Sequence, residues 1–174
     1  SGEIQLLADM ELTTEAEMVW SPDGKFIAVT LDALFVVEVA SGDTHQITIS
    51  NSVSSPSWSP DSSRLAFQSS GELYLIDPDG RNLQQLTRAM PYVWQPAYSP
   101  VSEDILYLSS DNEDTRFDIL HLSEGAATTA IKIEGFETFM AYWSPDGQHI
   151  AFDVYAAAEP EVVVRGYADV YVIN

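Results

Sequence analysis

The sequence predicts an all-β protein made of four copies of one four-stranded antiparallel sheet, which is the architecture of a β-propeller. Three observations support this. A ten-residue segment recurs without a gap in the alignment, and each copy continues into two further strand-like segments. The whole unit is about 40 residues long, the size of one propeller blade. The four copies occupy residues 20–29, 58–67, 98–107 and 143–152.

The repeated segment predicts a strand, a tight turn and a second strand. An aromatic residue ends the first strand in every copy, as Trp20 does in the first. Ser-Pro-Asp-Gly at residues 21–24 forms the turn, because proline presets φ, aspartate accepts bonds from its own backbone and glycine adopts the left-handed conformation. Residues 27–29 are continuously apolar, so both faces of the second strand are expected to be buried. The second copy lacks the glycine, and the third has Pro-Val-Ser at residues 100–102 in place of Pro-Asp-Gly, which weakens both turns.

Two more strands complete the unit. The third strand is rich in β-branched and aromatic residues, and turn signals follow it in the first three copies. The third strands are predicted at residues 34–37, 73–76, 119–122 and 170–173. The fourth strands are predicted at residues 44–49, 82–87 and 128–133.

The two ends of the sequence indicate how the sheets are completed. Residues 1–7 match residues 41–47, which form the turn and fourth strand of the first copy, whereas the last copy stops after its third strand. We therefore expect residues 1–174 to form one domain in which the first strand completes the last sheet, hiding its open edge. This arrangement gives a closed four-bladed ring. The alternative is a part of a six- to eight-bladed ring that pairs with another copy through its open ends.

These motifs resemble the TolB-type repeat, also called the WD40-like or PD40 repeat. The resemblance rests on Trp-Ser-Pro-Asp-Gly at residues 20–24, the Ile-Ala-Val strand after it and the later strand that ends in Asp-Gly at residues 79–80, and it covers nearly the whole chain. It implies a non-enzymatic propeller that binds a protein or peptide partner. For the better-known members it also implies export to the periplasm or the cell exterior. No partner-binding residue of the family is matched here.

Composition restricts the partners. The chain has 27 acidic residues against seven lysines and arginines, a net charge of −20, and no cysteine. A charge of this sign argues against duplex nucleic acid and anionic membrane surfaces. No apolar run is long enough for membrane insertion. We interpret the acidity as a solvated surface that keeps the protein soluble.

Long connections on one rim predict a binding surface. The step from second to third strand is 5 and 6 residues in the first two copies but 12 and 18 in the last two. Long loops in compact domains are usually functional or disordered, and clustered aromatics are typical interface anchors. The competing interpretation is that these aromatics pack between blades. The predicted binding residues are Tyr92, Trp94, Phe117, Phe136, Phe139 and Tyr142.

Other candidate chemistry is weaker. Asp111, Glu113 and Asp114 could hold calcium, although a solvated acidic turn is the preferred interpretation. No other cofactor is predicted. His121 is expected to be a hydrogen-bonded core residue.

No nucleophile elbow, phosphate loop or zinc-protease motif occurs, so the chain is predicted not to be an enzyme. Two alternatives stay open. One is the propeller of a larger enzyme, either a prolyl-oligopeptidase-type peptidase or a polysaccharide lyase. The other is a self-assembling structural fragment, a homo-oligomer joined through open blade edges.

Overall fold

The protein folds into four antiparallel sheets. The computed structural model describes residues 6–9, 16–48, 52–88, 92–110, 114–134, 136–138, 140–156 and 169–173. Within these ranges the regular elements are all strands, so the all-β prediction is confirmed. No helix that could cross a membrane occurs among the described residues.

Each of the first three sheets consists of four strands in sequence order. The first sheet contains β1 (Glu17–Trp20), β2 (Phe26–Thr30), β3 (Leu34–Glu38) and β4 (Thr44–Gln46). The second contains β5 (Val53–Trp58), β6 (Leu65–Ser69), β7 (Glu72–Ile76) and β8 (Gln84–Gln85). The third contains β9 (Tyr92–Tyr98), β10 (Asp104–Ser110), β11 (Asp114–His121) and β12 (Ala126–Glu134).

The fourth sheet is arranged differently. Its strands are β13 (Phe136–Glu137), β14 (Ala141–Trp143), β15 (Ile150–Ala156) and β16 (Asp169–Ile173). Both β13 and β14 pair with β15, at different positions along it. Among the described strands, β16 pairs with β15 alone.

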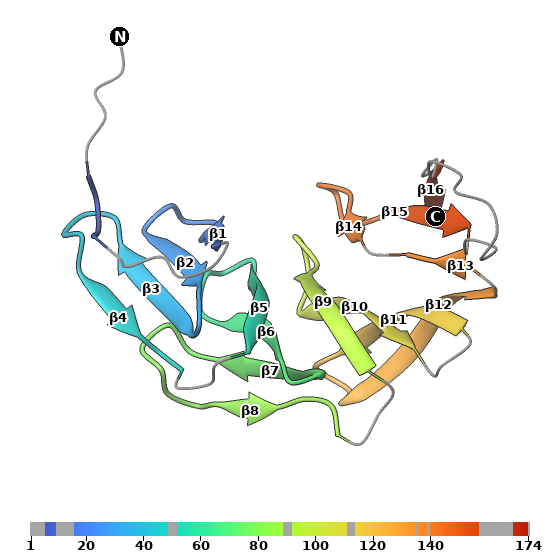
Figure 1. Cartoon of the computed structure of the whole chain (residues 1–174), viewed down its shortest axis with the longest axis horizontal. Coiled ribbons are helices and arrows are strands. Elements are labelled where there is room, and N and C mark those ends of the chain that lie inside the picture. Colours follow the sequence, from blue (N-terminus) through green and yellow to red (C-terminus); the bar gives the residue numbers. More distant parts are fainter. Residues whose placement is uncertain are drawn as a thin grey trace, which may run out of the picture.

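The sheets follow one another around an open arc, with β1, β5, β9 and β14 on its inner side (Figure 1). An open arc agrees with part of a larger propeller, the second of the two predicted arrangements. Leu7 lies beside the first sheet, where a Cβ atom on Gly42 would be 2.5 Å from the Leu7 carbonyl oxygen. The predicted pairing of residues 1–7 with the last sheet falls mainly on residues 1–5, outside the described ranges.

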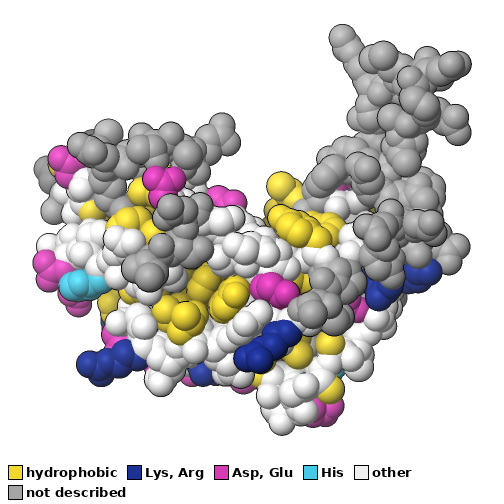
Figure 2. All heavy atoms as spheres, turned by 60° about the horizontal axis from the view of Figure 1, so that its bottom comes forward, with side chains coloured by type: hydrophobic (Ala, Val, Ile, Leu, Met, Phe, Trp, Pro, Cys, Tyr) yellow, Lys and Arg dark blue, Asp and Glu magenta, His cyan; other side chains and the backbone are white. Residues whose placement is uncertain are grey.

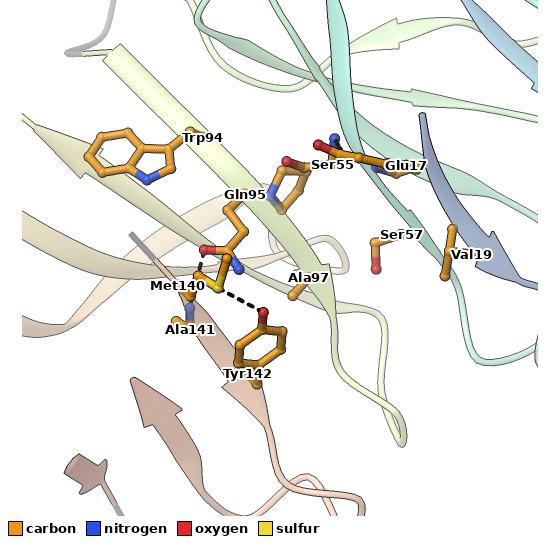
Figure 3. Close-up of a pocket in the computed structure, with 12 residues that line it drawn as sticks. Glu17, Val19, Ser55, Ser57, Trp94, Gln95, Ala97, Met140, Ala141 and Tyr142 are labelled. Carbon is orange, nitrogen blue, oxygen red and sulfur yellow. Dashed lines mark hydrogen bonds between the residues drawn. The ribbon is translucent and has the colours of Figure 1, made fainter. Parts of the chain in front are cut away.

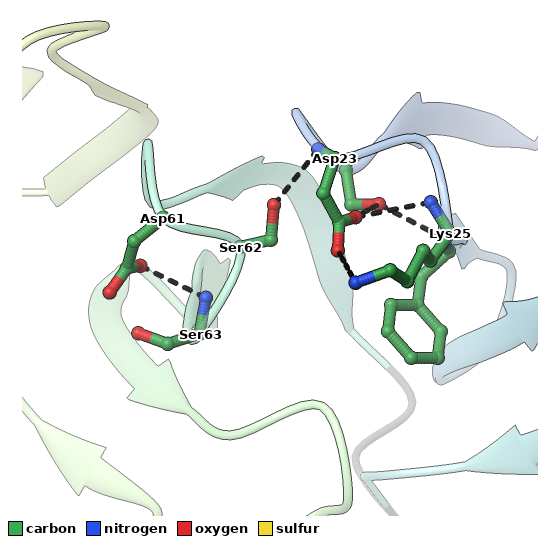
Figure 4. Close-up of polar contacts among 7 residues, drawn as sticks. Asp23, Lys25, Asp61, Ser62 and Ser63 are labelled. Carbon is green, nitrogen blue, oxygen red and sulfur yellow. Dashed lines mark hydrogen bonds and ion pairs between the residues drawn. The ribbon is translucent and has the colours of Figure 1, made fainter.

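The repeated turn is built from serine and aspartate side chains. Ser21 Oγ donates to Asp23 Oδ1 at 2.7 Å, and the same oxygen atom of Ser21 accepts from the Phe26 amide at 2.9 Å. Ser59 with Asp61 and Ser144 with Asp146 repeat this pattern. Neighbouring turns also meet, because the Asp23 amide donates to Ser62 Oγ at 3.1 Å (Figure 4).

Adjacent sheets bury their facing side chains in three successive cores. Leu34, Trp58 and Phe67 belong to the core between the first and second sheets. Leu75 and Tyr107 belong to the next core. Phe117 and Phe152 belong to the third core, between the third and fourth sheets. Because the second sheet packs on a neighbour at each face, its strand β6 is buried along its whole length, which includes the apolar run predicted to be buried at residues 65–67.

The long connection predicted in the third copy is mostly strand. β10 extends to Ser110 and β11 begins at Asp114, with Ser110 paired to Thr115. Alternation explains this: Thr115 and Phe117 are buried, while Arg116 between them is partly exposed. The acidic residues of this segment indicated a loop, whereas the structure forms a strand with one buried face.

The surface agrees with the composition. Figure 2 shows a face on which basic side chains lie singly among acidic and neutral ones, with small hydrophobic patches between them. Lys25 and Arg81 on the surface each form an ion pair with a nearby aspartate, at 2.9 and 3.5 Å.

Candidate functional site

A pocket of about 460 Å³ lies on the inner side of the arc. All four sheets contribute to it, mainly through their inner strands (Figure 3). A volume of this size is in the range of small-ligand and side-chain pockets. Its lining residues are Glu17, Val19, Ser55, Pro56, Ser57, Trp94, Gln95, Pro96, Ala97, Met140, Ala141 and Tyr142.

Two strand bulges shape the wall of the pocket. Ser55 in β5 and Gln95 in β9 adopt positive φ angles of 53° and 50°, and the pairing register shifts at both places. Each precedes a proline, which disfavours compact backbone conformations at the residue before it. A non-glycine residue in the left-handed region before proline is strained, and strain of this kind concentrates at functional sites.

Hydrogen bonds between neighbouring sheets hold the bulges. The Ser55 amide donates to Glu17 Oε2 at 2.6 Å, which joins the second sheet to the first. The Ala141 amide donates to Gln95 Oε1 at 3.2 Å, which joins the fourth sheet to the third. Both hydrogen bonds lie at the pocket, so contacts between neighbouring sheets fix the position of its wall (Figure 3).

Two aromatic side chains, Trp94 and Tyr142, line the pocket, and each contacts a neighbouring side chain. Tyr92 and Trp94 lie with ring centroids 5.9 Å apart, and Tyr92 is 62% exposed. Tyr142 is 55% exposed and its hydroxyl donates to the Met140 sulfur at 3.1 Å. The structure therefore brings Trp94 and Tyr142, two of the predicted binding residues, to one pocket.

The other predicted aromatics lie elsewhere. Phe117 has no exposed surface and packs against Phe152 with ring centroids 4.7 Å apart, so it belongs to the core between the third and fourth sheets and not to a rim. Phe136 is in β13, but its side chain is outside the description, and Phe139 is outside the described residues.

The predicted calcium residues are mostly outside the description. Asp111 and Glu113 are not among the described residues, and only the backbone of Asp114 is placed, in β11. Among the described residues no group of three or more His, Asp or Glu side chains gathers around one point. His121 is hydrogen-bonded, with Nδ1 3.0 Å from Asp104 Oδ1 and Nε2 3.0 Å from Thr128 Oγ1.

The sequence interpretation missed Glu17, Ser55, Gln95 and Met140. A signal for the bulges was present, because proline stands two residues before the aromatic in the second and third copies, at Pro56 and Pro96. Proline inside a strand marks an edge or a bulge. Nothing in the sequence showed that Glu17 would reach the neighbouring sheet.

No protein-family model matches the sequence. An uncharacterized protein of Agrobacterium fabrum is 25% identical over 160 residues, covering 80% of this chain and 55% of that protein. TolB from Acinetobacter baumannii superimposes with a TM-score of 0.70 and 19% identity, over 90% of this chain and 43% of that chain.

The chain has the fold of a TolB-like β-propeller. This fold is also shared with enzymes: oligogalacturonate lyase from Vibrio parahaemolyticus superimposes with a TM-score of 0.72 and 14% identity, over 98% of this chain and 54% of that chain. The chain thus spans about half the length of each of these three proteins. Identities this low establish the fold alone.

Proposed function

We propose that this chain is a non-enzymatic propeller module that binds a protein or peptide segment in the inner pocket. The observation that carries the proposal is the pocket itself, to which all four sheets contribute and which Trp94, Met140 and Tyr142 line. Aromatic and methionine side chains are enriched in protein interfaces and adapt to apolar side chains of a partner. The TolB-like fold supports this function and an exported location.

The pocket chemistry favours a partner with an apolar side chain next to a basic group. Glu17 is the charged residue among the pocket lining, and the whole chain carries a net charge of −20. One Glu17 oxygen accepts the Ser55 amide at 2.6 Å, and a carboxylate has further acceptor sites for a lysine or arginine. A long-range negative field also speeds the approach of a cationic segment.

The enzyme-associated alternative is supported only by the shared fold. A likeness to an oligogalacturonate lyase shows that such sheets occur in enzymes, and the larger-enzyme interpretation stays a prediction. The binding function is preferred because the described pocket offers apolar surface and a carboxylate.

A peptide selection tests the proposal. A displayed library of random peptides is selected against the chain, and enriched peptides are measured by fluorescence anisotropy. We expect enriched sequences to combine an aromatic or leucine with lysine or arginine. The double variant Trp94→Ala/Tyr142→Ala should weaken their binding about 30-fold or more, as for loss of interface anchors.

Leu83→Ala is the matched control, because Leu83 is 59% exposed and lies away from the pocket. It should bind the same peptides as the unchanged chain does. No enrichment, or peptides that bind the double variant equally well, would overturn the proposal.

A further inference from the structure

We propose that a peptide segment crosses the inner pocket in one fixed order, with its main chain held by the side-chain amide of Gln95. A basic group of the segment lies over the first sheet, a backbone carbonyl binds Gln95 on the third sheet, and an apolar side chain lies over the fourth. This order rests on the proposed binding function and specifies which chemistry each sheet recognises.

One position of the repeat reaches the pocket from every sheet. It is the third residue before the aromatic that ends each inner strand, and its four occupants are Glu17, Ser55, Gln95 and Met140. All four line the pocket. The Ser-Pro turn after the aromatic is the same in all four copies, whereas this position holds an acid, a hydroxyl, an amide and a thioether. Each sheet therefore offers a ligand a different contact.

A hydrogen bond fixes the orientation of the Gln95 side-chain amide. The Ala141 backbone amide is a donor, so the Gln95 atom that it reaches at 3.2 Å is the oxygen Oε1. The two N–H groups on Nε2 then point away from Ala141. No described residue accepts a hydrogen bond from them, and Gln95 lines the pocket. Two donors are thus available to a ligand.

The bulge in β9 places this amide. Gln95 has a φ of 50°, precedes Pro96 and lies where the register with β10 shifts. A bulge turns one side chain out of the regular alternation of a strand and is frequent next to functional sites. The bulge and the Ala141 bond together hold the donors in position, so binding requires little further ordering of the side chain.

A backbone carbonyl is the acceptor that suits these donors. A carboxylate would also accept, but Glu17 lines the same pocket and the chain carries a net charge of −20, which repels anions. A neutral carbonyl meets no such repulsion, and every residue of a peptide provides one. Gln95 therefore recognises the main chain of the segment, and the neighbouring sheets recognise its side chains.

The neighbours of Gln95 set the order of the contacts. Figure 3 shows Gln95 between the contact of Glu17 with Ser55 and the side chains of Met140 and Tyr142. One oxygen of Glu17 accepts the Ser55 amide, and the carboxylate keeps further acceptor sites for a lysine or arginine. Met140 and Tyr142 line the pocket from the fourth sheet and suit an apolar side chain.

An ester scan tests the contact with Gln95. The probes are peptides enriched on the unchanged chain, with each backbone amide replaced in turn by an ester, whose carbonyl is a weaker acceptor. We expect one ester to weaken binding to the unchanged chain about fivefold. The same ester should have no effect on binding to Gln95→Glu, which keeps an oxygen for the Ala141 amide and removes both N–H donors.

Gln84→Glu is the matched control for the ester scan. It adds the same charge at an exposed position in β8, outside the pocket lining, and should keep the ester effect. Circular dichroism checks that each variant is folded.

A second measurement tests the order. Replacing the basic residue of the peptide by norleucine should weaken binding to the unchanged chain about tenfold, and much less to Glu17→Gln, which keeps an oxygen for the Ser55 amide. Glu38→Gln is the control, because Glu38 accepts a bond from Ser41 at 2.8 Å outside the pocket lining. A benzophenone group at the apolar end of the peptide should cross-link to Met140.

Three results would overturn this order: an equal ester effect with Gln95→Glu, an equal norleucine effect with Glu17→Gln, or cross-links from the apolar end to the first sheet. If the peptides still lose binding to the double variant Trp94→Ala/Tyr142→Ala, the proposed function stands without the order. A selection that enriches no peptide rejects both.

Discussion

Phe117 belongs to the core, although the sequence predicted it as a binding residue. It is fully buried and packs on Phe152 between the third and fourth sheets. Replacing a buried phenylalanine by alanine removes apolar contacts and leaves a cavity. We expect Phe117→Ala to lower the free energy of unfolding by about 3–5 kcal/mol.

Urea unfolding followed by circular dichroism measures this change. Tyr92→Ala is the comparison, because Tyr92 is an aromatic on β9 of the same sheet with 62% of its surface exposed, and its replacement should cost much less. Equal losses for the two variants would contradict the assignment of Phe117 to the core.

The turn aspartates link stability to pH. The Lys25 side chain, with help from Ser21, lowers the pKa of Asp23 to about 2 from its ordinary value of 3.8. Hydrogen bonds from Ser59 and Ser144 likewise lower the pKa values of Asp61 and Asp146. A carboxyl group with a lowered folded-state pKa stabilises the protein above its unfolded pKa, and this contribution is lost as pH falls through the folded pKa.

We therefore expect the melting temperature to fall between about pH 4 and pH 2, and Asp23→Asn to flatten part of this dependence. Thermal melts at a series of pH values measure the effect. Asp43→Asn, which removes one charge from another exposed turn, is the control. An unchanged pH profile for Asp23→Asn would show that the Ser-Asp turn does not depend on its charge.

At the scale of elements, the aromatic that ends the inner strand of the second, third and fourth sheets joins that sheet to the sheet before it. Trp58 forms this contact with an indole hydrogen bond to the Val19 carbonyl. Tyr98 replaces tryptophan in the third sheet, and its buried hydroxyl has no hydrogen-bond partner within the described residues. Burial raises the pKa of the Tyr98 hydroxyl above its ordinary value, with the Glu103 charge adding to the effect.

These two positions should respond oppositely to phenylalanine. Trp58→Phe loses a satisfied hydrogen bond and some buried area, so we expect a loss of about 1–2 kcal/mol of stability. Tyr98→Phe removes an unpaired buried hydroxyl, so we expect no loss, or a gain of up to about 1 kcal/mol.

Chemical unfolding of the two variants beside the unchanged chain gives both values. A marked loss of stability for Tyr98→Phe would mean that the Tyr98 hydroxyl has a bonding partner after all.

The sequence predicted most strands and turns correctly, and it predicted only some of the residues that line the pocket. The recurring Trp-Ser-Pro-Asp-Gly segment predicts strand, turn and strand because each residue type has a local conformational role. Trp94 and Tyr142 were both predicted as binding residues and both line the pocket. The Glu17–Ser55 bond could not be predicted, because it joins two strands 38 positions apart through a bulge.

The misplacement of Phe117 has a physical cause as well. Acidic residues before it indicated a solvated loop, whereas alternation along β11 buries Thr115 and Phe117. Side-chain alternation is a weak signal when only a few residues carry it.

At the scale of the molecule, sheets packed face to face must overcome a large negative charge. The chain has 27 acidic and seven basic residues, and this self-repulsion is screened by salt. We expect the melting temperature to rise as sodium chloride is raised to about 0.3 M, a range in which the Debye length shortens markedly. A melting temperature that falls with salt would indicate that favourable ion pairs outweigh the repulsion.

Hydrogen exchange of the tryptophan indole protons, followed by NMR, tests the sheet-on-sheet arrangement most directly. Slow exchange at Trp58 and Trp143 with fast exchange at Trp20 is the result that this arrangement predicts. Fast exchange at all three indoles would contradict it.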